Sequence, residues 1–432
     1  MVRGAIAGGA TVAAAAALLA GHAPAGRVVQ LPAGVVELHT EMVVEGPAHV
    51  EGASGGTILR AAGDFHGRAL VVVRGNRVTL SGFSLDGNRG ALTAATPAGL
   101  PPSNRAFAQF TAANGILAEG CSHLAISGLR LRNVAGFAVL VSRSRDVAID
   151  GLEISDSGSL DSQGRNNTTG GILLEEGTAD FRVTYCRFRN IRGNGVWTHS
   201  LYTSPRNADG LIAWNSFLGI GRDALQVGHA SHVRVLENAG RQIGYPEKIV
   251  EDIPVAIDTA GNVDRSVYAR NRFAGINGKC IDLDGFHDGA VEDNDCRDMA
   301  NFAIVFNDSN PDMLSRNVRV TGNFIEGARY GGIFLIGEGH TIAHNRLTDL
   351  NTARCGPCYY LTDQPDMLRS GIYLARGVSR PSPARGNRIE DNLITGFGMR
   401  RRCVVSAPGI AADANRIRGN VCRDLTPLEA IR

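Results

Sequence analysis

The sequence has little lysine, few aromatic side chains and almost no excess of charge. Only two of its 44 basic residues are lysines, Lys248 and Lys279, aromatic residues make up 6% of the chain, and the formal net charge is +2. Without such an excess, the chain lacks the electrostatic signature of a nucleic-acid or anionic-membrane partner. After residue 26 no apolar run is long enough for a transmembrane helix. We therefore expect no nucleic-acid partner and no membrane span.

Glycine, in contrast, is abundant, with 54 residues in a chain of 432. Hydrophobic residues make up 44% and charged residues 20%, a composition that can bury a core and is not typical of disorder. Residues 1–26 begin with a basic residue, continue with an Ala-rich apolar stretch and end with small residues. This pattern fits either a secretory signal peptide or an N-terminal capping helix. We expect residues 27–432 to form one domain.

A small residue followed by an aliphatic one recurs along the chain. The spacing between aliphatic members is at least about 23 residues, and longer intervals indicate loops inserted into a fixed unit. The pairs are Gly115-Ile116, Ala138-Val139, Gly171-Ile172, Gly195-Val196, Ala224-Leu225, Ala256-Ile257, Cys280-Ile281, Ala303-Ile304, Gly332-Ile333, Gly371-Ile372 and Gly409-Ile410. Such a period predicts a repeat architecture rather than several ordinary domains.

A second column of asparagines accompanies these pairs, each followed two residues later by an apolar residue, as in Asn271/Phe273 and Asn345/Leu347. Around both columns apolar and polar residues alternate, which predicts short strands with one buried face. A unit of about 23 residues with two or three strands is a coil of a parallel β-helix. We expect the asparagines to stack at one corner and bond the turn backbone.

Two further segments resemble a known family. The stretch VVQLPAGVVEL, from Val28 to Leu38, is similar to the first coil of pectin-lyase-like proteins, and Asp86-Gly-Asn88 resembles their frequent DGN turn. The resemblance to this right-handed parallel β-helix superfamily covers residues 28–425. It implies an all-β, right-handed solenoid of about 12 coils. Members include polysaccharide lyases, glycoside hydrolases and epimerases, with some phage spikes and adhesins, so the fold alone does not assign a reaction.

Outward-facing positions can be read from the repeat, because the residue after each aliphatic anchor should point to solvent. This column and the one two residues further on become polar in the middle of the chain. The residues placed on or beside this patch are Trp197, His199, Gln226, His229, Asp258, Lys279, Asp282, Asp284, His287, Asn307 and Asp308. Phe334 and Tyr373 continue the first column, and we expect them, with Trp197, to stack on sugar rings.

The three carboxylates of the patch predict acid–base chemistry. Asp258 and Asp282 fall on adjacent coils about 5 Å apart, and Asp284 lies about 6.6 Å further along the strand. Repulsion between them would keep one protonated beside an ionised partner, which is the arrangement that glycoside hydrolysis needs. We predict Asp258, Asp282 and Asp284 as catalytic, with the other residues of the patch binding a polysaccharide or oligosaccharide.

Two alternatives remain open from the sequence. A polysaccharide lyase would use a base such as Lys279, and Ca²⁺ would assist if the aspartates supply oxygen ligands; otherwise we expect no cofactor and no metal. A non-catalytic β-helix that binds glycans or has a structural role is the second alternative. The sequence leaves the sugar, the stereochemistry and the oligomeric state undecided.

Six of the eight cysteines fall into two groups. Cys186, Cys280, Cys296 and Cys422 fall on repeat positions and are interpreted as buried thiols. Cys355 and Cys358 form a Cys-Gly-Pro-Cys loop without the context of a redox fold, so a local disulfide is the expectation. A disulfide fits a secreted or periplasmic protein.

Overall fold

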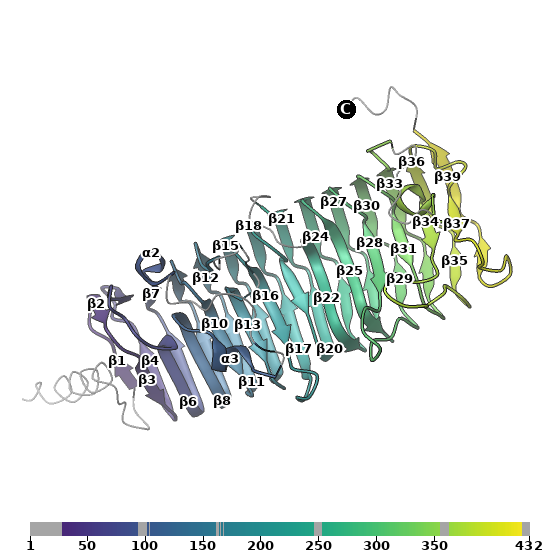
Figure 1. The fold of residues 1–432 in the computed structure, drawn as a ribbon. Coiled ribbons are helices and arrows are strands. Elements are labelled where there is room, and N and C mark those ends of the chain that lie inside the picture. Colours follow the sequence, from purple (N-terminus) through teal and green to yellow (C-terminus); the bar gives the residue numbers. More distant parts are fainter. Residues whose placement is uncertain are drawn as a thin grey trace, which may run out of the picture. The chain divides into compact units, whose positions relative to one another are not determined.

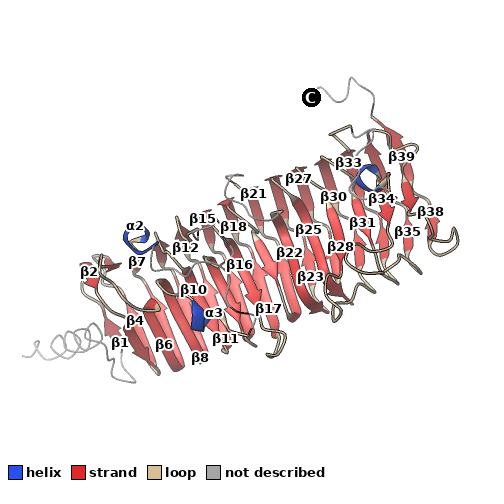
Figure 2. Cartoon of the chain, in the orientation of Figure 1, coloured by secondary structure: helices blue, strands red, loops and turns tan. Residues whose placement is uncertain are grey.

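The structure is a computed structural model that describes residues 28–93, 102, 104–160, 164, 166, 168–245, 253–354 and 363–425 (Figure 1). These residues form two units, which are described separately. The first unit ends at Arg222 and the second begins at Asp223. Nearly all regular structure in both is β-strand (Figure 2). The segment 1–26, with its predicted signal peptide or capping helix, lies outside the described residues.

The first unit consists of parallel strands arranged as three faces. Each turn of the chain adds one strand to each face. The first face contains β3 (Met42–Glu45), β6 (Ala69–Ser81), β8 (Asn114–Ser127), β10 (Phe137–Ser142), β13 (Gly170–Glu175) and β16 (Asn194–His199). The second face contains β1 (Val28–Gln30), β4 (Ala48–Glu51), the distal halves of β6 and β8, β11 (Arg145–Asp150), β14 (Ala179–Thr184) and β17 (Asn207–Ala213). The third contains β2 (Gly34–Leu38), β5 (Thr57–Ala61), β7 (Ser84–Asp86), β9 (Arg130–Arg132), β12 (Glu153–Ser155), β15 (Arg187–Ile191) and β18 (Ser216–Ile220).

The second unit repeats the same three faces. Its first face contains β19 (Leu225–Val227), β22 (Val255–Asp264), β25 (Lys279–His287), β28 (Ile304–Asn307), β31 (Ile333–Leu335), β34 (Ile372–Leu374) and β37 (Val404–Ser406). Its second face contains β20 (Ala230–Leu236), β23 (Val267–Ala269), β26 (Ala290–Glu292), β29 (Arg319–Thr321), β32 (Thr341–Ala343), β35 (Arg388–Glu390) and β38 (Arg416–Arg418). Its third contains β21 (Ala239–Ile243), β24 (Arg272–Ile276), β27 (Asp295–Met299), β30 (Phe324–Ala328), β33 (Arg346–Leu350), β36 (Leu393–Gly396) and β39 (Val421–Asp424).

The all-β class and the parallel stacking are thus confirmed, while the hand and the number of about 12 coils remain predictions. The single domain 27–432 also remains a prediction. In the described residues helix is limited to α2 (Arg89–Leu92), α3 (Phe107–Phe110) and a 3-10 turn at Met367–Arg369. None of these is long and apolar enough to cross a bilayer.

Strand register confirms the predicted anchors within each unit. Ile116, Val139, Ile172 and Val196 are successive partners in the first unit. Leu225, Ile257, Ile281, Ile304, Ile333 and Ile372 are successive partners in the second. The last predicted pair, Gly409-Ile410, is wrong, because Ile372 pairs with Val404 and residues 408–410 form a turn.

The small residue before each anchor has a steric cause. A Cβ added to Gly171 would collide with the carbonyl oxygen of Gly195 on the next coil and press on the ring of Phe188. Gly371 faces the carbonyl oxygen of Cys403 in the same way, which identifies Cys403-Val404 as the true last pair. The coil is therefore narrow at this position, and larger side chains are excluded from it.

The predicted asparagine column is present in the second unit as a continuous ladder. Each side-chain oxygen accepts from the backbone and side-chain amides of the preceding asparagine, and each side-chain nitrogen also donates to a turn carbonyl. Its members are Asn238, Asn271, Asn294, Asn323, Asn345, Asn392 and Asn420. Asparagine satisfies buried turn backbone here because it offers both a donor and an acceptor.

The cysteines correct one prediction. Cys280 is bonded to Cys296 and Cys403 to Cys422, so three of the four residues interpreted as buried thiols are in disulfides. Cys186 is a buried free thiol, as predicted. The misassignment arose because adjacent positions of a narrow coil bring two cysteines close across the core. Cys355 and Cys358 lie outside the described residues.

The ladder predicts a large effect of truncating one central asparagine. Replacing Asn323 by Ala removes its bonds to Val291 and Asn345 and leaves two buried amide donors of Asn294 without an acceptor. We expect Asn323→Ala to lower the free energy of unfolding by about 2 to 4 kcal/mol, measured by urea denaturation. Thr352→Ala, at an exposed position, is the control and should change it by less than about 0.5 kcal/mol. Equal stability of the two variants would contradict the role of the ladder.

Candidate functional site

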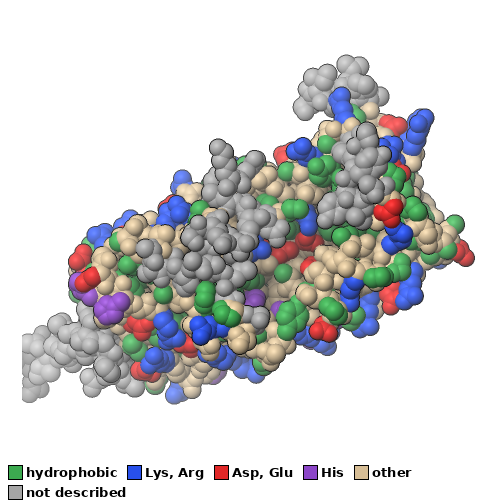
Figure 3. Space-filling model, in the orientation of Figure 1, with side chains coloured by type: hydrophobic (Ala, Val, Ile, Leu, Met, Phe, Trp, Pro, Cys, Tyr) green, Lys and Arg blue, Asp and Glu red, His purple; other side chains and the backbone are tan. Residues whose placement is uncertain are grey.

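The predicted acidic patch lies on the first face of the second unit, on β22, β25 and the strands beside them. Gln226 pairs in register with Asp258, and Asp284 lies between Ala260 and Asn307. The offset that joins Ile257 to Ile281 also places Asp258 beside Asp282. Figure 3 shows acidic side chains gathered among neutral ones on the face that it draws. Equivalent atoms on adjacent strands are about 4.8 Å apart, so the carboxylates are close neighbours.

Two of the carboxylates have fixed polar partners. The amide nitrogen of Gln226 donates to Asp258 Oδ2 at 2.7 Å. The ammonium group of Lys279 is ion-paired with Asp282 Oδ2, and both side chains are mostly buried.

Asp284 differs from its two neighbours. It accepts hydrogen bonds from the backbone amide of Ser309 at 2.8 Å and from the Ser309 hydroxyl at 2.5 Å. Burial raises the pKa of Asp284; the bonds from Ser309 oppose that rise, and the negative charges of Asp282 and Asp308 add to it. A carboxyl group with a raised pKa beside an ionised one separates the roles of acid and base.

Three oxygens of this cluster have no hydrogen-bond partner among the described residues. They are Asp282 Oδ1, Asn307 Oδ1 and Asp308 Oδ1, and all three are inaccessible to solvent in the structure. Buried acceptors without donors are energetically costly. The second oxygen of Asp308 is ion-paired with Arg380 at 3.3 Å.

The two histidines predicted beside the patch are held by the fold. His287 pairs in register with Asp264 and bonds through its ring nitrogens to Asp288 and Asn262, at 2.7 and 2.9 Å. The ring of His229 packs against Gly261, where a Cβ would touch it. Both rings are buried and lie at the border of the acidic patch rather than on the outward column.

The aromatic residues are placed differently from the prediction. In the first unit, Trp197 packs edge-on against Phe107 of α3 and is 7% exposed, and His199 contacts the same two rings. In the second, Phe334 and Tyr373 are 3% and 1% exposed. Because stacking on a sugar requires an open ring face, the structure does not favour the predicted stacking role of Trp197, Phe334 and Tyr373.

Segments outside the repeat cause this burial. The segment that carries α3 covers the apolar outward column of the first unit, where Leu117, Leu140 and Leu173 form one cluster with Trp197. The hydroxyl of Tyr373 donates to the buried Gln364, which lies in the insertion before β34.

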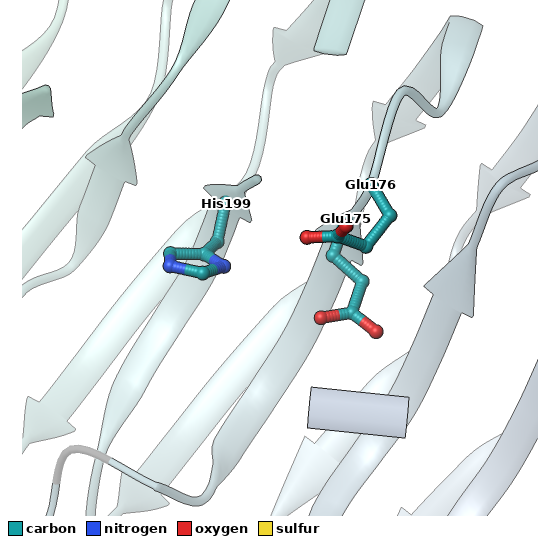
Figure 4. A group of neighbouring side chains, drawn as sticks. All are labelled: Glu175, Glu176 and His199. Carbon is teal, nitrogen blue, oxygen red and sulfur yellow. The ribbon is translucent and has the colours of Figure 1, made fainter. Parts of the chain in front are cut away.

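A second group of ionisable residues lies in the first unit and was not predicted as a site. The ligand atoms of Glu175, Glu176 and His199 are within 4.8 Å of one another (Figure 4). Glu175 and His199 are partners in register, and both stand on the second outward column predicted from the repeat. In the described residues this is the set whose spacing comes nearest to a metal site, although no metal was expected from the sequence.

The two glutamates of this group already serve the fold. Glu175 accepts from the backbone amides of Phe107 and Ala108, both at 2.8 Å, and so anchors α3 over the sheet. Glu176 accepts from the amide of Leu201 at 2.9 Å and from the hydroxyl of Ser204. We therefore interpret the two glutamates as anchors that hold α3 and the segment from Leu201 to Ser204 in place.

Next to the acidic patch, the second unit contains a cavity of about 310 Å³. Its lining includes Asp308, Arg316, Glu338, Arg380 and Arg385, so charged groups of both signs surround it. Asp308 belongs to both the cavity and the acidic patch. The patch thus has room for a ligand to extend on this side.

Comparison with known proteins shows the fold. No family model and no curated protein matches the sequence. Among solved structures, the surface adhesin PfbA of Streptococcus pneumoniae has a TM-score of 0.57 and 14% identity over 79% of this chain and 86% of the adhesin. A mannuronic acid specific polysaccharide family 6 lyase from human gut microbiota has a TM-score of 0.52 and 15% identity, over 96% and 90%.

The catalytic domain of a GH87 alpha-1,3-glucanase is also similar, with a TM-score of 0.53 and 13% identity over 91% of this chain and 64% of that domain. The lyase and the glucanase have parallel β-helix folds, as predicted for this chain. At such low identities the likeness establishes the architecture, and the chemistry has to be argued from the residues.

Glu175 predicts a pH dependence of stability. Burial raises the pKa of Glu175 to about 7, from an ordinary value of 4.5, so the folded state binds this proton more tightly than the unfolded state. Its contribution to stability is complete below about pH 4.5 and is lost as the pH rises through about 7, a loss of about 3 kcal/mol. We expect Glu175→Gln to remove this part of the pH dependence of unfolding.

The measurement is chemical denaturation of wild type and variant between these two pH values. Glu37→Gln, at an exposed position on β2, is the control and should keep the wild-type profile. A Glu175→Gln profile parallel to that of wild type would show that this carboxyl group does not carry the effect.

Proposed function

We propose that the protein is a carbohydrate-active enzyme that cleaves glycosidic bonds of a polysaccharide or oligosaccharide, by hydrolysis. The observation that carries the proposal is the set of carboxylates on neighbouring strands, Asp258, Asp282 and Asp284, each in a different environment. The presence of a polysaccharide lyase and a glucanase among the similar structures supports it.

Asp284 is the proposed general acid, because its raised pKa keeps the carboxyl group protonated to higher pH than an ordinary aspartic acid. Asp282 is ion-paired with Lys279, and Asp258 is oriented by Gln226. Either can act as nucleophile or as base toward water. Separations of about 5 Å and about 6.5 Å or more correspond to retaining and inverting hydrolysis, and the ladder offers both.

The remaining residues of the patch have supporting roles in this proposal. Asn307, which pairs in register with Asp284, and Asp308, which lines the neighbouring cavity, are the proposed contacts for sugar hydroxyls. Gln226, His229, Lys279 and His287 fix the carboxylates and the walls around them. The roles proposed from the sequence for Trp197, His199, Phe334 and Tyr373 are not part of this site.

The ion pair of Lys279 bears on the choice between hydrolysis and elimination. A lyase base must be free to take the proton next to the uronate carboxyl group, whereas the ammonium group of Lys279 is engaged in an ion pair with Asp282. The contact therefore favours hydrolysis. Calcium-assisted elimination would instead need the aspartates as metal ligands.

We also propose that the protein acts outside the cytoplasm, in the periplasm or in secreted form. The disulfides Cys280–Cys296 and Cys403–Cys422 support this, since such bonds persist in oxidising compartments. A polysaccharide substrate is found there as well.

The catalytic proposal predicts the effect of neutralising each carboxylate. Asp284→Asn should lower kcat by about 100-fold to 10,000-fold, and Asp258→Asn and Asp282→Asn should also impair turnover, on a glycan found by screening the wild type against a panel. Because the acid must be protonated, kcat/KM of the wild type should fall as the pH rises through the pKa of Asp284. Asp295→Asn, on the third face of the same unit, is the control.

The products separate the alternatives. Hydrolysis gives new reducing ends alone, whereas elimination also gives an unsaturated uronate that absorbs in the ultraviolet. Release of the unsaturated product would replace hydrolysis by lyase activity. Glycan binding without any cleavage, or full activity in all three aspartate variants, would overturn the catalytic assignment.

A further inference from the structure

One arginine in the second unit holds the loop that runs from Asp308 to Met313. The Nε of Arg380 donates to the carbonyl oxygen of Asp308 and its Nη1 to that of Pro311, both at 2.9 Å. Its Nη2 donates to the carbonyl oxygen of Met313 and to the carboxylate of Asp308. Because the guanidinium is rigid and planar, a single side chain fixes both ends and the middle of the loop.

This loop brings Ser309 to Asp284. The amide and the hydroxyl of Ser309 bond the two carboxylate oxygens separately, and the hydroxyl also lies 3.6 Å from the sulfur of Met313. The loop therefore orients the carboxyl group and shields it from water. Both effects depend on the loop staying in place.

Arg380 has no bond to Asp284, so any influence on it passes through the loop. The guanidinium lies in the lining of the 310 Å³ cavity, as does that of Arg385. Arg385 donates to Glu338 at the surface instead of to the loop. The two arginines thus share a cavity but differ in their partners.

We propose that Arg380 is a positioning residue for the candidate site, which fixes the loop from Asp308 to Met313 so that Ser309 orients and covers Asp284. The inference depends on the proposed function only in giving Asp284 a catalytic role. The structural part, from Arg380 through the loop to Asp284, rests only on the hydrogen bonds that Arg380 and Ser309 make.

The charged surroundings of Asp284 determine how it should titrate. Asp258 lies on β22, Asp282 with its partner Lys279 lies on β25 itself, and Asp308 lies on the loop. The residues directly beside Asp284 in register, on β22 and β28, are uncharged. Burial is the largest cause of its raised pKa, and the two hydrogen bonds from Ser309 oppose that rise; freeing the loop changes both influences and should therefore alter the titration of Asp284.

The test compares Arg380→Ala, Arg380→Lys, Ser309→Ala and the control Arg385→Ala in the full-length protein. Hydrogen exchange reports on the loop amides, and ¹³C NMR of labelled aspartate reports on Asp284. In Arg380→Ala we expect the amides from Asp308 to Met313 to exchange at least about tenfold faster and the titration of Asp284 to depart from that of wild type. Arg380→Lys should restore part of both, and Arg385→Ala should match wild type.

Ser309→Ala separates the two effects of the loop. It removes one hydrogen bond to the carboxylate while the loop remains held, so the pKa of Asp284 should rise while the loop amides exchange as in wild type, unlike in Arg380→Ala. The proposed function adds that the high-pH limb of kcat/KM moves with this pKa in each variant.

Wild-type exchange and wild-type titration of Asp284 in a folded Arg380→Ala variant would overturn the inference. A failure of the proposed function has a different signature: Asp284→Asn would keep its activity while Arg380→Ala still frees the loop and shifts the titration. The two outcomes are therefore distinguishable.

Discussion

Parallel hydrogen bonding between successive turns of the chain is the constraint on which the rest of this structure depends. It keeps equivalent residues about 4.8 Å apart, so every position of the repeat becomes a column. A column of asparagines is stabilising, because each amide is both donor and acceptor for the next. A column of carboxylates is not, because like charges at this distance repel and one of them must hold its proton or find a cation.

The structure contains two groups of neighbouring carboxylates, and their surroundings differ. Glu175 is buried and bonded to the backbone amides of α3, so its carboxyl group is part of the fold. The aspartates of the second unit instead contact three different partners: a lysine, a glutamine and a serine. Some of their oxygens have no hydrogen-bond partner among the described residues. Unequal surroundings for similar groups are typical of acid–base sites, which is why we assign function to the second set.

The sequence predicted the features of the structure that follow from the repeat. The anchor pairs, the asparagine column and the alignment of Asp258, Asp282 and Asp284 follow from a fixed spacing and alternation, which local residues encode. Features made by the insertions were not predictable in the same way. The burial of Trp197 under Phe107, and the bonds of Arg380 to the loop around Ser309, join segments that have no periodic relation. The disulfides were missed because cysteine at a repeat position fits a buried thiol as well as a bonded pair.

The central claim is that the ladder places three carboxylates close enough for their ionisation to be unequal. The most direct measurement is a pH titration of the wild-type protein with ¹³C-labelled aspartate, in which Asp258, Asp282 and Asp284 are assigned individually. Our account predicts that Asp284 titrates above the range of ordinary aspartates and that its shift responds when its neighbours lose their protons. Independent titration of all three at ordinary pKa values would contradict the account.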